Sequence, residues 1–165
     1  MQVQEANMSY DLQRFISAQD RDYETALAEI CSGHKSSHWI WYIFPQITGL
    51  GHSSTSKYYA IENLDEAKAY MDEPILRERL IRISEALLSL DNNDAEDVMG
   101  WPDDMKLRSS MTLFSIAAPG ESVFQKVLDK FWVGELDQKT LETVRSQAKT
   151  RYDASPDQSL SERRN

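Results

Sequence analysis

A helical repeat of apolar residues that begins just after a proline constrains the fold of this chain more than any other feature. Leu76, Leu80, Ile83 and Leu87 are spaced i, i+4, i+7 and i+11, so they form one stripe along an α-helix. Pro74 stands where proline favours the first turn of a helix. Because such a stripe must be buried against other elements, the pattern predicts a helix that faces a core.

The same periodicity predicts helices through most of the chain. In the first half of the chain we expect a short helix near residues 12–16, a second that ends at Gly33, and a third that is capped by Asp65 and ends before Pro74. The helix from Pro74 follows, then a short helix from Asp94 to Gly100 and one from Pro102 to about Ala117. Two more helices carry residues 124–131 and 141–148, and Asp137 caps the last of them. We therefore predict an all-α fold, a compact single-domain array of about six to eight helices.

Six consecutive bulky residues at 39–44 fit a buried strand as well as a fully buried helix. No second strand-like run offers a pairing partner, and an isolated strand would leave its backbone hydrogen-bonding groups unsatisfied. We favour a helix for this segment.

The length of the chain, 165 residues, fits one domain with a core of its own. Residues 1–8 are polar and without a pattern, and residues 149–165 contain too few apolar side chains to offset the entropy cost of ordering. We expect a flexible lead at 1–8, a helical domain at 9–148 and a flexible polar tail at 149–165.

The formal net charge of −9 at pH 7 argues against broad nucleic-acid binding, which needs clustered lysine and arginine. A local basic pocket can still exist on an acidic protein. No window is long and apolar enough for a membrane span, and no secretory signal pattern is present. The single cysteine, Cys31, excludes an intramolecular disulfide and is expected to be a buried thiol, so we expect a cytoplasmic protein.

Two segments, 38–56 and 100–114, combine large apolar side chains with hydroxyls, glycines and cations. That composition is typical of a ligand pocket with a few convergent polar groups. In the second segment, Lys106, Ser109 and Ser110 interrupt an apolar surface of the expected helix, and we call these three residues the polar helix face.

If the polar helix face is buried, its members need partners, because an unpaired buried hydroxyl or amine costs about 1–3 kcal/mol or more. Two interpretations are open. Backbone carbonyls and a carboxylate such as Asp103 or Asp137 satisfy these groups, or an anionic ligand does. A nucleophilic pair of Lys106 and Ser110 is weakly supported, because the usual Ser-x-x-Lys order is reversed and no oxyanion donor can be named.

The opposite side of the same helix carries Arg108, Thr112 and Ser115. Three polar side chains at this spacing share one side of an α-helix. We expect this side to be solvated.

The loop Gly49–Ser56 offers backbone amides at Gly49 and Gly51 and hydroxyls such as that of Ser54, which can cradle a phosphate, and Lys57 follows it. Its spacing is neither that of a P-loop nor that of a dinucleotide fingerprint, and a plain turn with serine caps is the alternative. We predict that this loop meets the polar helix face and forms one pocket for an anionic ligand.

Trp41 and Gln46 complete the predicted ligand-binding set. The Trp41 side chain can stack on a ring of a ligand, although a run of bulky residues such as 39–44 more often belongs to the core. Gln46, which follows Pro45, can instead stabilise a turn. No cofactor is indicated by these residues.

His38 and His52 are the candidates for proton transfer, with a hydrogen-bonding ring near the tryptophans as the alternative for His38. His34 and His38 have the i, i+4 spacing of metal ligands, but the helix is expected to end at Gly33 and nothing completes a tetrahedral set. We predict no metal site, and the residues do not decide whether the protein is an enzyme.

Motifs follow one another in a fixed order over most of the chain: LQRF at 12–15, FPQ at 44–46, GLG at 49–51, DEA at 65–67, PDD at 102–104 and KLRSSMTLF at 106–114. These motifs and their order resemble the DUF1810 family over about residues 9–145. The resemblance implies a compact, predominantly α-helical single domain, and it implies no particular reaction.

Two functional hypotheses follow. The first is a pocket that binds, or binds and acts on, a small anionic ligand that is phosphorylated or nucleotide-like. The second is a non-catalytic helical protein-interaction module with an acidic surface, whose protein partner is unknown. An open cleft that joins the two segments favours the first, and a closed polar network without a cavity favours the second.

Overall fold

The structure, a computed structural model, describes residues 10–153, and every regular element within this range is an α-helix. Nine helices lie within the described range, against about six to eight predicted; α4 was not expected, and two expected helices form one. In chain order they are α2 (Gln13–Ser32), α3 (Ile40–Ile43), α4 (Ser54–Tyr59), α5 (Leu64–Asp72), α6 (Pro74–Leu88), α7 (Ala95–Met99), α8 (Asp103–Ala117), α9 (Val123–Trp132) and α10 (Gln138–Asp153). The all-α prediction is confirmed.

Two helix starts differ from the prediction. The first two expected helices form the continuous α2, because no glycine or proline interrupts residues 13–32, and Gly33 ends it with φ of +89°. Helix α5 begins one residue after Asn63, whose side chain accepts a hydrogen bond from the backbone N–H of Glu66 at 2.9 Å. Asp65 therefore lies in the first turn instead of capping the helix.

Other local signals are confirmed. Pro74 is the first residue of α6, and the side chain of Asp94 caps α7 by accepting from the backbone N–H of Asp97 at 3.2 Å. Asp137 caps α10 in the same way through Thr140. The bulky run at 39–44 contains the single helical turn α3, as favoured.

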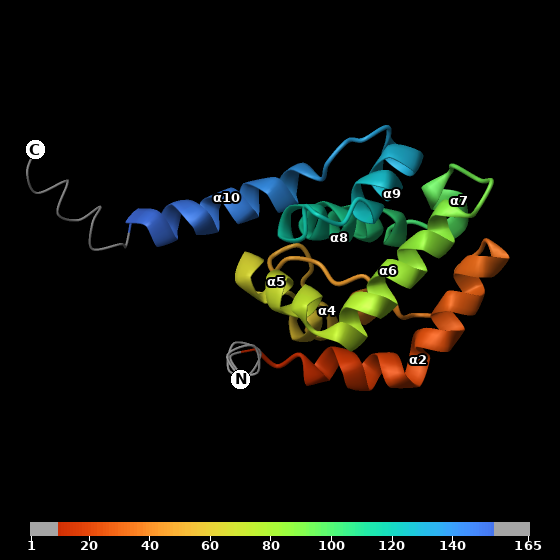
Figure 1. The fold of residues 1–165 in the computed structure, drawn as a ribbon, viewed down its shortest axis with the longest axis horizontal. Helices are drawn as coiled ribbons and strands as arrows, with labels where there is room; N and C mark the ends of the chain where they lie inside the picture. Colours follow the sequence, from red (N-terminus) through yellow and green to blue (C-terminus); the bar gives the residue numbers. More distant parts are fainter. Residues whose placement is uncertain (1–9, 154–165) are drawn as a thin grey trace, which may run out of the picture.

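Helix α8 lies at the centre of the fold and contacts α3, α5, α7, α9 and α10, while α2 and α9 both pack on α6 (Figure 1). A chain of aromatic rings crosses the core. The ring centroids of Phe15 and Tyr70 lie 5.2 Å apart, those of Tyr70 and Phe114 lie 5.1 Å apart, and those of Phe114 and Phe124 lie 5.9 Å apart. Such pairs add about 0.5–1.5 kcal/mol each to the burial of the rings. The four rings join α2, α5, α8 and α9.

The side of α8 that was expected to be solvated is covered. Thr112 is fully buried, and its hydroxyl accepts a hydrogen bond from the backbone N–H of Asp137 at 2.9 Å. Arg108 donates to the backbone carbonyl of Glu135 at 3.0 Å. The chain that enters α10 packs on this side, which the sequence of α8 alone does not reveal. Cys31, expected to be buried, is exposed.

Helix α10 runs outward from the rest of the fold and continues to Asp153, past the expected domain boundary at 148 (Figure 1). The predicted lead at 1–8 and the part of the predicted tail at 154–165 lie outside the described residues. Among the helices that the structure describes, none is both long and apolar enough to span a membrane.

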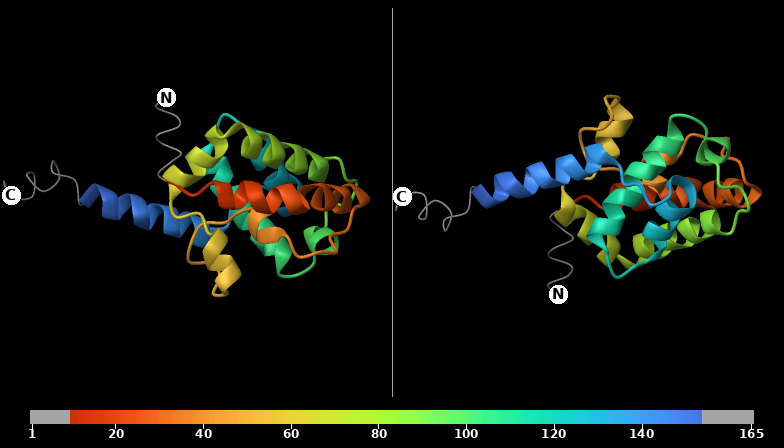
Figure 2. Two further views of the ribbon diagram at one scale, coloured as in Figure 1. Left: turned by 90° about the horizontal axis from the view of Figure 1, so that it is seen from below. Right: turned by 90° about the horizontal axis from the view of Figure 1, so that it is seen from above.

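Residues 47–61 form a loop whose two ends meet, and we call this segment the α4 loop. An isolated bridge joins Ile47 to Ile61, with hydrogen bonds of 2.8 Å from Thr48 N to Ile61 O and from Ile61 N to Gln46 O. Helix α4 within it contains no buried residue and stands out from the body of the molecule (Figure 2). The α4 loop is therefore held at its base, and Leu50 and Tyr59 within it pack against the core.

Candidate functional site

A pocket of about 310 Å³ lies where the α4 loop approaches α8 and the start of α10, and we call it the lysine pocket. Its apolar lining residues are Trp41, Ile47, Leu50, Tyr59, Ala60, Pro102 and Met105. Its other lining residues are Gln46, Thr48, Gly49, Gly51, Ser56, Lys57, Lys106, Ser109, Asp137 and Lys139. The two chemically dense segments of the sequence thus line one concavity.

Six of the eight residues predicted to bind a ligand line the lysine pocket. They are Trp41, Gln46, Gly49, Gly51, Lys106 and Ser109. Ser54 is exposed on α4 and does not line it, and Ser110 is fully buried. His38 and His52 are exposed and do not line it either. Ligand binding by this set stays a prediction.

The polar helix face is divided between the pocket and the core. One helical step of about 100° separates Ser109 from Ser110, so the two hydroxyls point in different directions. Ser109 donates to Met105 O or to Asp137 Oδ2, both at 3.1 Å. The hydroxyl of Ser110 is buried and has no hydrogen-bond partner among the described residues.

The two glycines of the α4 loop have different structural roles. Gly49 adopts φ of +93°, a conformation that L side chains rarely adopt. A Cβ at Gly51 would lie 2.6 Å from both Cβ and Oγ of Ser56, so only glycine permits this approach to α4. Ser53 caps α4 by accepting from Ser56 N at 3.0 Å. These features place Ser56 and Lys57 at the pocket.

Lys106 is held at the pocket by contacts with Trp41 and Asp103. Its Nζ lies 5.3 Å from the centroid of the Trp41 ring and 3.6 Å from Oδ1 of Asp103. The other oxygen of Asp103 pairs at 2.7 Å with Lys35, whose side chain is only 5% exposed. Because Asp103 is shared with a buried lysine, it compensates only part of the charge of Lys106, which keeps contact with the pocket.

The loop that carries Lys35 is fixed by Glu29 of α2. The carboxylate of Glu29 accepts hydrogen bonds from Ser36 N at 2.7 Å, Ser37 N at 2.9 Å, Ser37 Oγ at 2.5 Å and Trp39 Nε1 at 3.0 Å. Burial alone raises the pKa of this carboxyl, but the hydrogen bonds outweigh burial and lower its pKa to about 2. Glu29 is therefore ionised at neutral pH.

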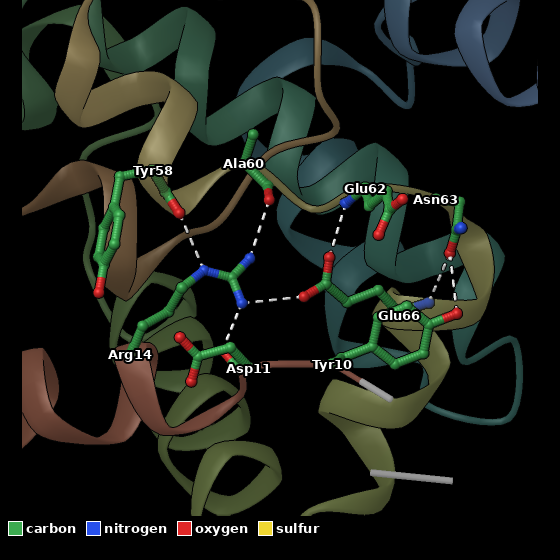
Figure 3. Close-up of polar contacts among 8 residues, drawn as sticks. All are labelled: Tyr10, Asp11, Arg14, Tyr58, Ala60, Glu62, Asn63 and Glu66. Carbon is green, nitrogen blue, oxygen red and sulfur yellow. Dashed lines mark hydrogen bonds and ion pairs between the residues drawn. The ribbon is translucent and has the colours of Figure 1, made fainter. Parts of the chain in front are cut away.

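Arg14 of α2 anchors the end of α4 although it does not line the pocket (Figure 3). Its guanidinium donates to the backbone carbonyls of Tyr58 and Ala60, both at 2.9 Å, and pairs with Glu66 at 3.0 Å. Glu66 in turn accepts from the backbone N–H of Glu62 at 2.7 Å. Since the two carbonyls flank Tyr59, this network positions an aromatic wall of the lysine pocket. No local sequence pattern around Arg14 predicts this role.

The charge inside the pocket is opposite to the charge of the whole chain. Three lysines, Lys57, Lys106 and Lys139, line it together with one carboxylate, Asp137, in a chain of net charge −9. Lys139 was not predicted, because it joins the site from α10, which begins at Gln138, 24 residues after the second dense segment ends at residue 114. No group of three or more metal-ligating side chains that could hold a metal ion occurs in residues 10–153.

Comparisons with known proteins agree with this architecture. A family model described as "Protein of unknown function (DUF1810)" matches residues 9–144. The chain is also similar to the crystal structure of the conserved hypothetical protein Rv1873 from Mycobacterium tuberculosis, with 36% sequence identity and a TM-score of 0.81 over 83% of this chain and 98% of that one. No curated protein matches.

Proposed function

We propose that this chain, which belongs to the DUF1810 family, binds a small anionic ligand, phosphorylated or nucleotide-like, in the lysine pocket. The observation that carries the proposal is the local reversal of charge. Three lysines and one carboxylate line a concave site on a chain whose net charge is −9. Nearby charges determine which ligands a site attracts more than net charge does, so this pocket favours anions.

The remaining lining residues support the same ligand class. The hydroxyls of Thr48, Ser56 and Ser109 and the backbone of the α4 loop offer hydrogen bonds to oxygen atoms. Trp41 and Tyr59 offer aromatic surface to an apolar or ring-containing part of the ligand. Neither His38 nor His52 lines the pocket, so the proposal is one of binding and gives neither histidine a role.

The test is a thermal-shift screen of the full chain with AMP, ribose 5-phosphate, glycerol 3-phosphate and pyrophosphate, followed by calorimetric titration of each probe that stabilises the protein. Lys106→Met should weaken binding at least about tenfold, because a hydrogen bond to a charged group contributes about 1.5–3 kcal/mol. The matched control is Lys126→Met, because Lys126 is an exposed lysine of α9 that does not line the pocket.

We expect both variants to keep the helical circular dichroism of the parent chain and only Lys106→Met to lose affinity. Equal affinity of the parent and Lys106→Met would place the anion elsewhere. Failure of all four probes would reject the proposal.

The second hypothesis, a non-catalytic helical protein-interaction module with an acidic surface, is favoured by two exposed aromatic residues. Trp101 is 73% exposed beside Pro102, and Tyr58 is 58% exposed beside Lys57. Exposed aromatic side chains often contribute strongly to protein interfaces. This hypothesis predicts that no anionic probe stabilises the protein.

A further inference from the structure

We infer that the ligand of the lysine pocket carries a free hydroxyl beside its anionic group, and that Asp137 accepts a hydrogen bond from that hydroxyl. The ligand class is then a phosphate ester of a polyol, a sugar or a nucleoside, rather than a compact polyanion. This inference rests on the proposed function, because it names the ligand class of the same site.

Asp137 is held rigidly at the pocket wall. Its backbone N–H donates to the hydroxyl of the fully buried Thr112 at 2.9 Å. Its Oδ2 accepts from Ser109 Oγ at 3.1 Å, Thr140 N at 3.0 Å and Thr140 Oγ1 at 2.6 Å. A carboxylate fixed in this way does not need to be ordered again when a ligand binds.

The second carboxylate oxygen of Asp137, Oδ1, is free to accept a hydrogen bond. No described residue donates to Oδ1, and this oxygen is accessible to solvent. No ion pair within 4.0 Å joins Asp137 to a lysine in the described chain, although Lys106 and Lys139 line the same pocket. An ionised carboxylate is only an acceptor, so Oδ1 offers an uncompensated acceptor to the ligand.

A ligand of the lysine pocket meets both the positive charges of the lysines and the negative charge of Asp137. The lysines attract phosphate, whereas Asp137 repels any phosphate oxygen that comes close to it. A ligand that is anionic throughout meets this repulsion, and a ligand with a hydroxyl at that position gains a charge-assisted hydrogen bond instead. Sites that hydrogen-bond a ligand hydroxyl discriminate strongly against analogues that lack it.

The role of Asp137 as the cap of α10 does not require its charge. Asparagine caps helices about as well as aspartate, so Asp137→Asn keeps the oxygen that accepts from Thr140. The same substitution places an NH₂ donor where Oδ1 stands. The substitution therefore removes the charged acceptor for a ligand hydroxyl, while it preserves the cap at the start of α10.

The test is calorimetric titration of the full chain with two matched pairs of probes. Glycerol 3-phosphate and propyl phosphate share a phosphate and a three-carbon chain, and AMP and 2′,3′-dideoxy-AMP share a base and a phosphate. In each pair only the first member carries the additional hydroxyls. We expect the parent chain to bind the hydroxylated member of at least one pair tenfold or more tightly, and Asp137→Asn to reduce that preference to within twofold.

Lys106→Met should weaken both members of a pair by a similar factor, because the phosphate is common to them. Equal binding within both pairs, or a preference that survives in Asp137→Asn, would overturn this inference and leave the anion site standing. Failure of all four probes would reject the anion site, and this inference with it. If Asp137→Asn does not fold, Asp137→Ser retains a capping hydroxyl without the charge and takes its place.

Discussion

Two adjacent serines of α8 lie in different environments. Ser109 lies at the lysine pocket and bonds to Asp137, whereas Ser110 is fully buried with no partner among the described residues. A buried hydroxyl without a partner costs about 1–3 kcal/mol, while a satisfied one contributes about 1 kcal/mol. Identical side chains at adjacent positions therefore have opposite effects on stability.

We predict opposite results for the two alanine variants. Ser110→Ala should leave the free energy of unfolding unchanged or raise it by up to about 1 kcal/mol, because it removes an unsatisfied group. Ser109→Ala should lower it by about 1 kcal/mol, because Asp137 loses a donor. Urea denaturation of both variants measures the difference, and a loss of more than about 1 kcal/mol in Ser110→Ala would contradict this account.

Helix α4 depends on contacts from outside itself. It is six residues long, contains no buried residue and stands out from the body of the molecule (Figure 2). Isolated helices of this length are not stable in water. Its position rests on the Gly51 approach, the Ser53 cap and the carbonyl contacts of Arg14. We expect α4 to be the helix of the site that opens most readily.

Arg14→Gln should release the end of α4 and leave Glu66, whose side chain is 3% exposed, without its partner. Removing one member of a buried ion pair typically costs about 3–5 kcal/mol. We also expect faster amide hydrogen exchange over residues 52–60 than in the parent chain. Urea denaturation and hydrogen-exchange mass spectrometry measure the two effects.

The control is Arg82→Gln, because Arg82 is an exposed arginine of α6 outside the α4 loop. Substitution of an exposed surface residue typically changes the free energy of unfolding by no more than about 0.5 kcal/mol. Equal destabilisation by the two arginine variants would show that the buried network does not anchor α4.

Glu29 makes the free energy of unfolding of the folded chain depend on pH. Its pKa is lowered to about 2 in the folded chain by its four hydrogen-bond donors, although burial opposes this. The unfolded chain therefore binds a proton more readily, so this contribution is complete above about pH 5 and is lost as the pH falls toward 2. Burial raises the pKa of Asp104, which acts in the opposite direction.

Glu29→Gln should be less stable than the parent chain at pH 7 and should lose less stability on acidification. One pKa unit corresponds to about 1.4 kcal/mol, and solvent screens this half-buried carboxylate. Between pH 7 and pH 3 we expect the parent to lose about 1–2 kcal/mol more than the variant. Denaturant unfolding at the two pH values measures this, and parallel losses would exclude Glu29 as the responsible group.

Local signals in the sequence predict the described helices other than α4, and they place several of the helix ends. Pro74, Asp94, Asp137 and Gly33 act on backbone groups within four residues of themselves, so the residues nearby encode where α6, α7 and α10 begin and where α2 ends. The sequence also located six of the residues that line the lysine pocket, because they stand in two segments with a mixed polar and apolar composition.

The packing of the helices determines which polar residues of α8 face the pocket and which face the core. Helix α8 is contacted on several sides, so its own periodicity could not distinguish Ser109 from Ser110 or show that Thr112 is covered. Lys139 and Asp137 enter the pocket from a distant part of the chain, and Arg14 acts on the α4 loop across more than 40 residues. Such long-range placement depends on how the helices pack, and the spacing of residues along one helix does not contain it.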